Sequence, residues 1–247
     1  MHSVGFILNV SEDEADRELE QFLEDYEGDE REYLYFDTGD YYDTFEEMAQ
    51  DHPEVRQDST TWGTMNPYSQ CDYYTIGGRW AGYFTTKSGE KVDATTVGEI
   101  DFDWMEGNAR KKARETYAKI LEVIGNDKNF LTFDQIEKRH RRKYGPGIDY
   151  DAIREEYGKQ PQVKAWRDWK SENDPDLKYL TVNADVVLRP QREYEDEVVV
   201  NKMTPCAVVD NGSWDEVPHS TRDGLKWLRW FKGLPADTQV VMFDYHT

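Results

Sequence analysis

The 247-residue sequence predicts an α+β fold: a mostly antiparallel sheet with helices packed on one face and a helical insertion at about residues 103–172. Three observations predict it. β-branched and aromatic stretches stand near both ends of the chain, a long middle section repeats apolar residues at helical spacing, and Asn211-Gly212 is a strong hairpin signal. We expect a single α+β domain over 1–247, in which 103–172 is a candidate helical insertion or subdomain.

The first elements expected are a strand and an acidic helix. The first ten residues read as a strand that leads into Ser11, and Ser11 with Glu14 forms a capping box, in which side chain and backbone satisfy each other at a helix start. Apolar residues then recur at helical spacing, and Gly28 is the expected stop. A strand at 33–37 and a short helix at 44–51 should follow. The apolar stripe is Ala15, Leu19, Phe22, Leu23 and Tyr26.

The middle of the chain is predicted to be helical. A hairpin turn is expected at 87–90, and apolar residues then share one helical face from Asp103 to Ile124. Thr132 with Gln135 is a second capping box. Helices are expected after it at 132–144, 151–157 and 163–172.

Strand character returns in the last third of the chain. Asn211-Gly212 should join two strands, because a type I′ turn needs positive φ at both central residues. Residues 220–232 read as a helix that ends before Gly233. The strands expected from β-branched runs are at 179–188, 197–201, 206–210 and 239–245.

The acidic residues are concentrated at the N-terminus. The chain has 51 acids and 30 bases, and its first 60 residues hold 20 of the acids but only 3 bases. Localised charge of one sign repels nucleic acid and attracts a basic protein or cations, although many such runs are only solvated helix faces. We therefore expect a basic protein partner and no direct binding to nucleic acid. The candidate partner-binding residues are Glu12, Asp13, Asp16, Glu18, Glu20, Glu24 and Asp25.

A basic block lies in the middle of the chain. Residues 109–143 hold 11 bases and 5 acids, and six consecutive residues from Lys138 to Lys143 are basic or histidine. Three interpretations stay open: contacts to phosphates, neutralisation of the N-terminal acids, or a solvated helix face.

Several classes of protein are excluded or disfavoured. No apolar run of about 18 residues could cross a membrane, and the N-terminus lacks the pattern of a signal peptide, so we expect a cytoplasmic protein. Cys71 and Cys206 are too few for a disulfide framework and should be thiols. No phosphate-binding glycine motif or nucleophile elbow occurs, so no cofactor is expected and no reaction is assigned.

The most unusual stretch is Asp72-Tyr-Tyr-Thr-Ile-Gly-Gly-Arg-Trp80. Two adjacent glycines allow close approach of a ligand or chain, and they precede an arginine suited to carboxylate or phosphate and an indole that can stack. One interpretation is a pocket for a nucleotide-like ligand. The other is a bulge or tight turn in which Arg79 pairs with Asp72 and Trp80 is in the core. The candidate ligand-binding residues are Asp72, Tyr74, Gly77, Gly78, Arg79 and Trp80.

Two residues near the C-terminus, Asp244 and His246, invite a metal or acid–base interpretation. Residues at i and i+2 of a strand face the same side, and His2, Cys71 or Asp72 could join them. A metal site needs three or four ligands, and no spaced His or Cys cluster supplies them, so we expect no metal.

Two short motifs carry a resemblance. The Asn66-Pro67 pair followed by Ile-Gly-Gly-Arg-Trp, and the ending Leu-Pro-x-Asp-Thr…Asp-x-His, resemble a family of uncharacterised proteins encoded by bacteriophages and by bacteria with phage-derived genes. The family has no assigned activity, so the resemblance implies context and no catalytic residues. It favours a phage-type accessory protein that inhibits a host factor, such as a nucleic-acid-binding defence protein, through its acidic face. The alternative is a nucleotide-like ligand at residues 77–80, in a binding protein or an enzyme.

Overall fold

The chain forms two compact units. The computed structural model describes residues 2–23, 33–36, 41–42, 44–53, 62–66, 69–145, 147–173, 182–218 and 220–247. Unit 1 comprises Met1–Trp104 and Thr204–Thr247, and unit 2 comprises Met105–Met203. No helix within the described ranges is both long enough and apolar enough to cross a membrane.

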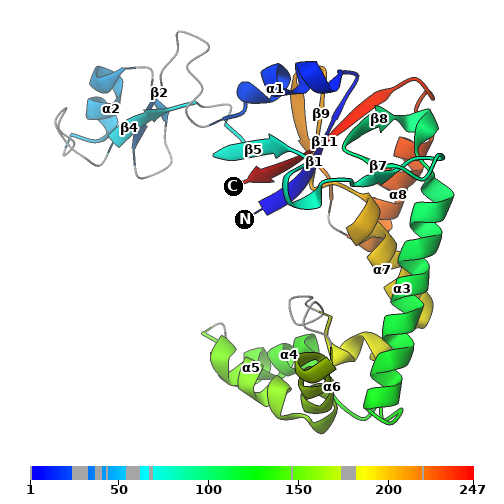
Figure 1. The fold of residues 1–247 in the computed structure, drawn as a ribbon. Coiled ribbons are helices and arrows are strands. Elements are labelled where there is room, and N and C mark those ends of the chain that lie inside the picture. Colours follow the sequence, from blue (N-terminus) through cyan, green and yellow to red (C-terminus); the bar gives the residue numbers. More distant parts are fainter. Residues whose placement is uncertain are drawn as a thin grey trace. The chain divides into compact units, whose positions relative to one another are not determined.

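Unit 1 is built on a six-stranded sheet, which confirms the α+β class (Figure 1). The strand order is β10-β9-β1-β11-β5, and β8 also pairs with β11. The neighbours run antiparallel except for β1 and β9, which are parallel. The strands are β1 (His2–Leu8), β5 (Tyr73–Ile76), β8 (Ala94–Thr96), β9 (Ala207–Asp210), β10 (Ser213–Glu216) and β11 (Gln239–His246).

Helices cover both faces of this sheet. Helix α1 (Glu12–Glu20) packs its apolar stripe on the face that carries Ile7. Helix α8 (Thr221–Lys232) packs on the opposite face, where its aromatic rings contact the ring of Phe6. The expected placement of helices on one face is thereby corrected. The reason is visible in β1, where Phe6, Ile7 and Leu8 are all buried, so both sides of the strand need cover.

Local signals in the sequence position the caps and turns as predicted. The Glu14 carboxylate accepts hydrogen bonds from the Ser11 N–H at 3.1 Å and from the Ser11 hydroxyl at 2.7 Å, and these bonds lower the pKa of Glu14. Asn211 and Gly212, with φ of 50° and 73°, form the turn between β9 and β10. The Ser220 hydroxyl accepts from the Asp223 N–H and caps α8.

The rest of unit 1 consists of short elements. The first helix ends at Glu20, earlier than expected, because Leu23 forms a bridge with Cys71; Tyr26 and Gly28 lie outside the described residues. The predicted turn at 87–90 joins a small hairpin. The elements are β2 (Tyr33–Phe36), β3 (Tyr41–Tyr42), α2 (Phe45–Asp51), β4 (Trp62–Met65), η1 (Gly78–Trp80), β6 (Phe84–Thr85), β7 (Lys91–Val92) and η2 (Val97–Glu99).

Unit 2 is helical. Its first helix begins in unit 1 at Phe102, and the helical section runs to Met203, beyond the expected limit of 172. Its core includes Ile120, Ile153 and Trp166, all buried. The elements are α3 (Phe102–Val123), α4 (Phe133–Tyr144), α5 (Tyr150–Lys159), α6 (Pro161–Asn173), η3 (Ala184–Leu188) and α7 (Gln191–Met203).

Two predicted strands are wrong. Residues 184–188 form the 3₁₀ helix η3, residues 179–181 lie outside the described residues, and 197–201 belong to α7. The run Val198-Val199-Val200 has high strand propensity, but Glu195, Val199 and Met203 are buried at successive spacings of four residues, as on a helix face. Packing in the core therefore outweighs the β-branched preference, which is a weak signal on its own.

Candidate functional site

The Ile-Gly-Gly-Arg-Trp motif forms a tight turn after β5. Gly77 and Gly78 have φ of +75° and +57° and lead into η1. A Cβ on Gly78 would lie 2.6 Å from the Cβ of Asp244, and one on Gly77 would lie 2.6 Å from a carboxylate oxygen of Asp93. Both positions therefore need glycine for two reasons, the positive φ and the close approach to a carboxylate.

The carboxylate below this turn, Asp244, is buried and fully partnered. It is only 1% exposed. Its Oδ1 lies 2.9 Å from Nδ1 of His2, and its Oδ2 accepts a hydrogen bond of 3.1 Å from the backbone N–H of Arg79. A buried carboxylate is costly without such partners, so the two bonds hold the turn, the first strand and the last strand together.

A second histidine–aspartate pair stands beside the first. Nδ1 of His246 lies 2.9 Å from both carboxylate oxygens of Asp72, and the ring centroids of His2 and His246 are 5.0 Å apart. Because an ionised carboxylate only accepts hydrogen bonds, we assign the Nδ1 proton to the donor role in each pair. Nε2 of each imidazole is then the nitrogen left for other chemistry.

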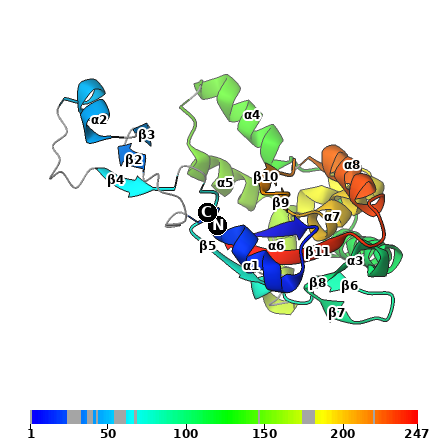
Figure 2. The same ribbon diagram turned by 90° about the horizontal axis from the view of Figure 1, so that it is seen from above.

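The sheet register brings these groups to one place. His2 is paired with His246 across β1 and β11, so the two ends of the chain lie side by side (Figure 1 and Figure 2). Asp244 lies two residues before His246 and points to the same face. The side chains of His2 and His246 are 25% and 39% exposed. Tyr73, whose ring centroid lies 6.4 Å from that of His2 in an edge-to-face arrangement, is 50% exposed. This end of the face is open to solvent.

Five of the six candidate ligand-binding residues lie on this turn or on the pair beside it. The exception is Tyr74, which points to the opposite face and donates a 2.8 Å hydrogen bond to the backbone oxygen of Asp16 in α1. Burial, with nearby acids, raises the pKa of Tyr74 to about 12. Asp72 pairs with His246 and not with Arg79, so that part of the tight-turn interpretation is wrong. Arg79 is exposed, and Trp80 is half-buried rather than in the core.

One residue of the site, Asp93, was not predicted from the sequence. Asp93 accepts a 2.6 Å hydrogen bond from the Gly82 N–H, and its backbone oxygen accepts from the Met242 N–H at 2.8 Å. It fixes the far side of the turn. No local pattern marks it, since a single aspartate before a short strand is ordinary.

Replacing Gly78 by alanine is expected to lower the free energy of unfolding by roughly 2–4 kcal/mol, because a left-handed conformation costs about 1–3 kcal/mol for other residues and the new Cβ also meets Asp244. Chemical denaturation measures it. Gly212→Ala is the matched control: its φ is +73°, but nothing lies within 4 Å of the added Cβ. Equal losses in the two variants would contradict a role for the close approach.

The second candidate site is the acidic face of α1. The side chains of Glu12, Asp13, Asp16 and Glu20 are exposed and Glu18 is half-exposed. The same helix buries Ala15 and Leu19 in the sheet core. Glu24 and Asp25 lie outside the described residues.

The basic block on α4 pairs within its own unit. Lys138 lies 3.5 Å from Asp134, Arg141 lies 2.7 Å from Glu137, and Arg139 and His140 both pair with Glu156 of α5. These acids belong to unit 2, so the block has local partners. By sequence, unit 1 has 32 acids and 10 bases, a net charge of −22, whereas unit 2 has 19 acids and 20 bases, a net +1.

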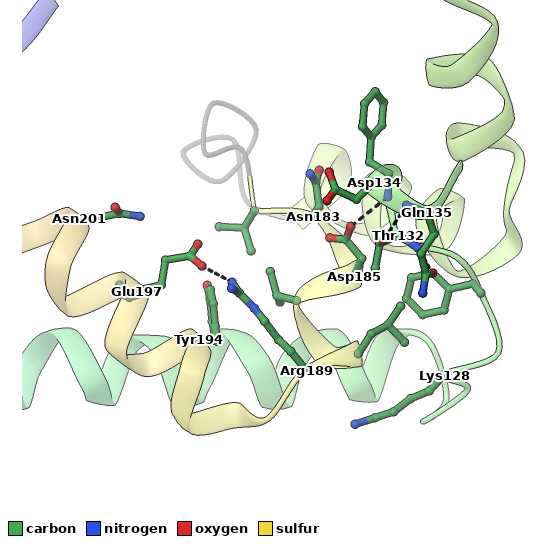
Figure 3. A pocket seen from close by; sticks show the side chains of 16 residues that line it. Lys128, Thr132, Asp134, Gln135, Asn183, Asp185, Arg189, Tyr194, Glu197 and Asn201 are labelled. Atoms are coloured by element: carbon green, nitrogen blue, oxygen red, sulfur yellow. Dashed lines mark hydrogen bonds and ion pairs between the residues drawn. The ribbon is translucent and has the colours of Figure 1, made fainter. Parts of the chain in front are cut away.

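Unit 2 contains a hollow of about 740 Å³ beside α4, η3 and α7 (Figure 3). Its charged groups all have protein partners. Arg189 pairs with Glu197, and the Phe133 N–H donates to Asp185, whose burial raises its pKa. None of the candidate residues from the sequence lies there.

Neither a metal cluster nor a relative supplies a function. Within the described ranges, no group of three or more His, Cys, Asp or Glu side chains could hold a metal ion. Comparisons with protein-family models, curated proteins and solved structures found no match.

Proposed function

We propose that this protein binds a basic partner protein through the acidic face of α1. In keeping with the resemblance to phage-encoded proteins, the partner is a nucleic-acid-binding defence protein in the cytoplasm of a bacterial host, and binding blocks its basic surface. The observation that carries the proposal is the division of charge: −22 on unit 1 and +1 on unit 2. A strong local field of one sign steers and selects partners of the other sign.

The charge density on α1 supports mimicry of nucleic acid. Six acids stand on its nine residues, a length of about 13 Å at 1.5 Å per residue. That is one negative charge per roughly 2 Å, denser than the 3.4 Å spacing of phosphates along one DNA strand. The acids are Glu12, Asp13, Glu14, Asp16, Glu18 and Glu20.

The helix is also held in place before any partner arrives. Its apolar stripe is buried against the sheet, and the hydroxyl of Tyr74 in β5 donates to the backbone oxygen of Asp16. A preformed surface binds more tightly than a mobile one, because less conformational freedom is lost on binding. The acids are therefore presented as a fixed array.

The test removes charge without weakening the helix. The first-turn acids, among them Glu14, favour the helix N-terminus and should stay. The test variant is Asp16→Asn/Glu18→Gln/Glu20→Gln. Proteins captured from bacterial lysate at low salt are identified, and the purified partner is titrated at several salt concentrations. We expect about a tenfold loss of affinity and a shallower salt dependence.

The matched control removes three exposed acids from unit 2, as Glu115→Gln/Glu122→Gln/Glu155→Gln. It changes the net charge of the chain by the same amount and should leave the affinity unchanged. Equal affinity of wild type and the α1 variant, or equal losses in both variants, would sink the proposal.

A further inference from the structure

We propose that His2 and His246 form an acid–base site that hydrolyses a small cyclic phosphodiester, of the class of the nucleoside 2′,3′-cyclic phosphates. The inference does not depend on the acidic face of α1. It rests on the two histidine–aspartate pairs, which three separate chain segments bring to one exposed end of the sheet.

The two imidazoles are arranged alike. In each ring, Nδ1 lies 2.9 Å from a carboxylate oxygen, which belongs to Asp244 for His2 and to Asp72 for His246. A carboxylate in this position fixes the ring orientation and the tautomer. Both Nε2 atoms are thus prepared for proton transfer. A single pair would be an ordinary structural contact, but two oriented pairs supply both an acid and a base.

The spacing suits one phosphoryl group. The ring centroids are 5.0 Å apart and the ring planes are inclined by 57°, so the imidazoles do not stack on each other. Hydrogen bonds from nitrogen to oxygen span about 2.7–3.2 Å, so two oxygens of one phosphoryl group can each contact a different imidazole. Displacement at phosphorus needs a proton removed from the attacking oxygen and one given to the leaving oxygen.

The reaction balances with water as the only co-reactant. Nε2 of one neutral imidazole takes a proton from water as the water oxygen bonds to phosphorus. The bond from phosphorus to one ribose oxygen breaks, and that oxygen takes a proton from Nε2 of the other imidazole, which starts protonated. The product is a nucleoside monophosphate, and the two imidazoles exchange protons with solvent to reset.

The surroundings favour a small substrate over a polymer. The net charge of −22 on unit 1 opposes a nucleic acid with many phosphates, whereas a cyclic phosphodiester carries one negative charge. The half-exposed ring of Tyr73 beside His2 offers a stacking surface for a base. Arg79 is exposed on the same turn whose N–H holds Asp244, and its guanidinium suits a phosphate.

The experiment incubates the full chain, freed of any tag at either end, with the four nucleoside 2′,3′-cyclic phosphates, both with and without EDTA. The nucleoside monophosphates formed are measured by chromatography. We expect turnover by wild type and a loss of at least 100-fold in His2→Gln and in His246→Gln, since general acid–base catalysis contributes about 10²–10⁴-fold. Glutamine can still donate a hydrogen bond to the aspartate, so the sheet should stay folded.

His140→Gln is the matched control, because His140 also pairs with a carboxylate, Glu156 at 2.8 Å, but lies in unit 2. It should keep full activity. The positioning role of Asp244 is read from the pH profile: Asp244→Asn should lower kcat and shift the profile, which a purely structural loss would not do.

Three outcomes would overturn the inference. They are no hydrolysis of any of the four substrates by folded wild type, equal rates in wild type and both histidine variants, and activity that EDTA abolishes and Zn²⁺ restores. The last would assign the imidazoles to a metal ion instead of to proton transfer. NMR gives a test that does not depend on turnover. The inference is supported if histidine signals shift on titration with a nucleoside 3′-monophosphate in wild type but not in the His2→Gln/His246→Gln variant.

Discussion

Replacing Phe6 by alanine is expected to lower the free energy of unfolding of unit 1 by about 3–5 kcal/mol, the range for loss of a buried phenylalanine. Phe6 is fully buried. Its ring lies 5.1 Å from Phe84, 5.9 Å from Trp227 and 5.5 Å from Phe231, so it joins α8 and the β6–β7 hairpin to the sheet. The effect is large because the Phe6 ring packs β1 against both β6 and α8. The cavity that the substitution leaves cannot collapse unless all three elements move.

Hydrogen exchange of amides in β1 and β11 measures this loss, because exchange reports local and global opening residue by residue. Phe6→Leu should cost less than about 1.5 kcal/mol, since most of the volume is kept. Trp230→Ala removes a larger but half-exposed aromatic from the same helix and should cost little. A loss under about 1 kcal/mol in Phe6→Ala would mean that α8 is not held by this cluster.

The parts of the fold that could be predicted from the sequence are those encoded locally. A capping box spans four residues, and the Asn211-Gly212 turn needs only its own two residues, so each can be read without knowing the rest of the chain. The helices of unit 2 also carry their apolar periodicity within single segments.

The failures occur where a segment's neighbours decide its structure. The valines of 198–200 would suit a strand, but they lie in a helix that packs into the unit 2 core. In β1 the burial of both faces depends on α1 and α8, which are far apart in the sequence. A strand buried on both sides gives a continuous apolar run, and such a run does not say which helix covers which face.

Only part of the candidate site could be predicted from the sequence. The i, i+2 spacing predicted that Asp244 and His246 share a face, and the glycines predicted a close approach. The partners could not be predicted. His2 reaches Asp244 and Asp72 reaches His246 only because β11 lies between β1 and β5, and strand order is not encoded in any one segment.

The charge asymmetry also has a sharper form in the structure than in the sequence. The excess of acids follows the boundary between the units, and the basic block of α4 has acidic partners within unit 2. An individual surface ion pair contributes little to stability. The main effect of these pairs is to reduce the electrostatic field around α4. The negative field around α1 is not balanced by bases of its own unit, because unit 1 holds 32 acids and only 10 bases.

Replacing Trp166 by alanine is the corresponding test of unit 2, where we expect a loss of about 3–5 kcal/mol in the free energy of unfolding. Trp166 is 2% exposed in the core and stacks on Trp169 with ring centroids 5.3 Å apart. Its indole N–H donates a 2.9 Å hydrogen bond to the backbone oxygen of Val182. Lys170 donates to the same oxygen at 3.1 Å, so that oxygen keeps a partner in the variant and the loss comes mainly from packing.

The same variant decides whether unit 2 behaves as the subdomain that the sequence predicted. Amides in α4 and α5 should lose protection by the full amount, while those of β11 should lose less, because the core of unit 2 is built from its own helices. Trp166→Phe is the control: it keeps a ring in the core and should cost roughly 1–2 kcal/mol. An equal loss of protection in β11 and in α5 would show that the chain opens as one cooperative unit, and the subdomain prediction would then be wrong.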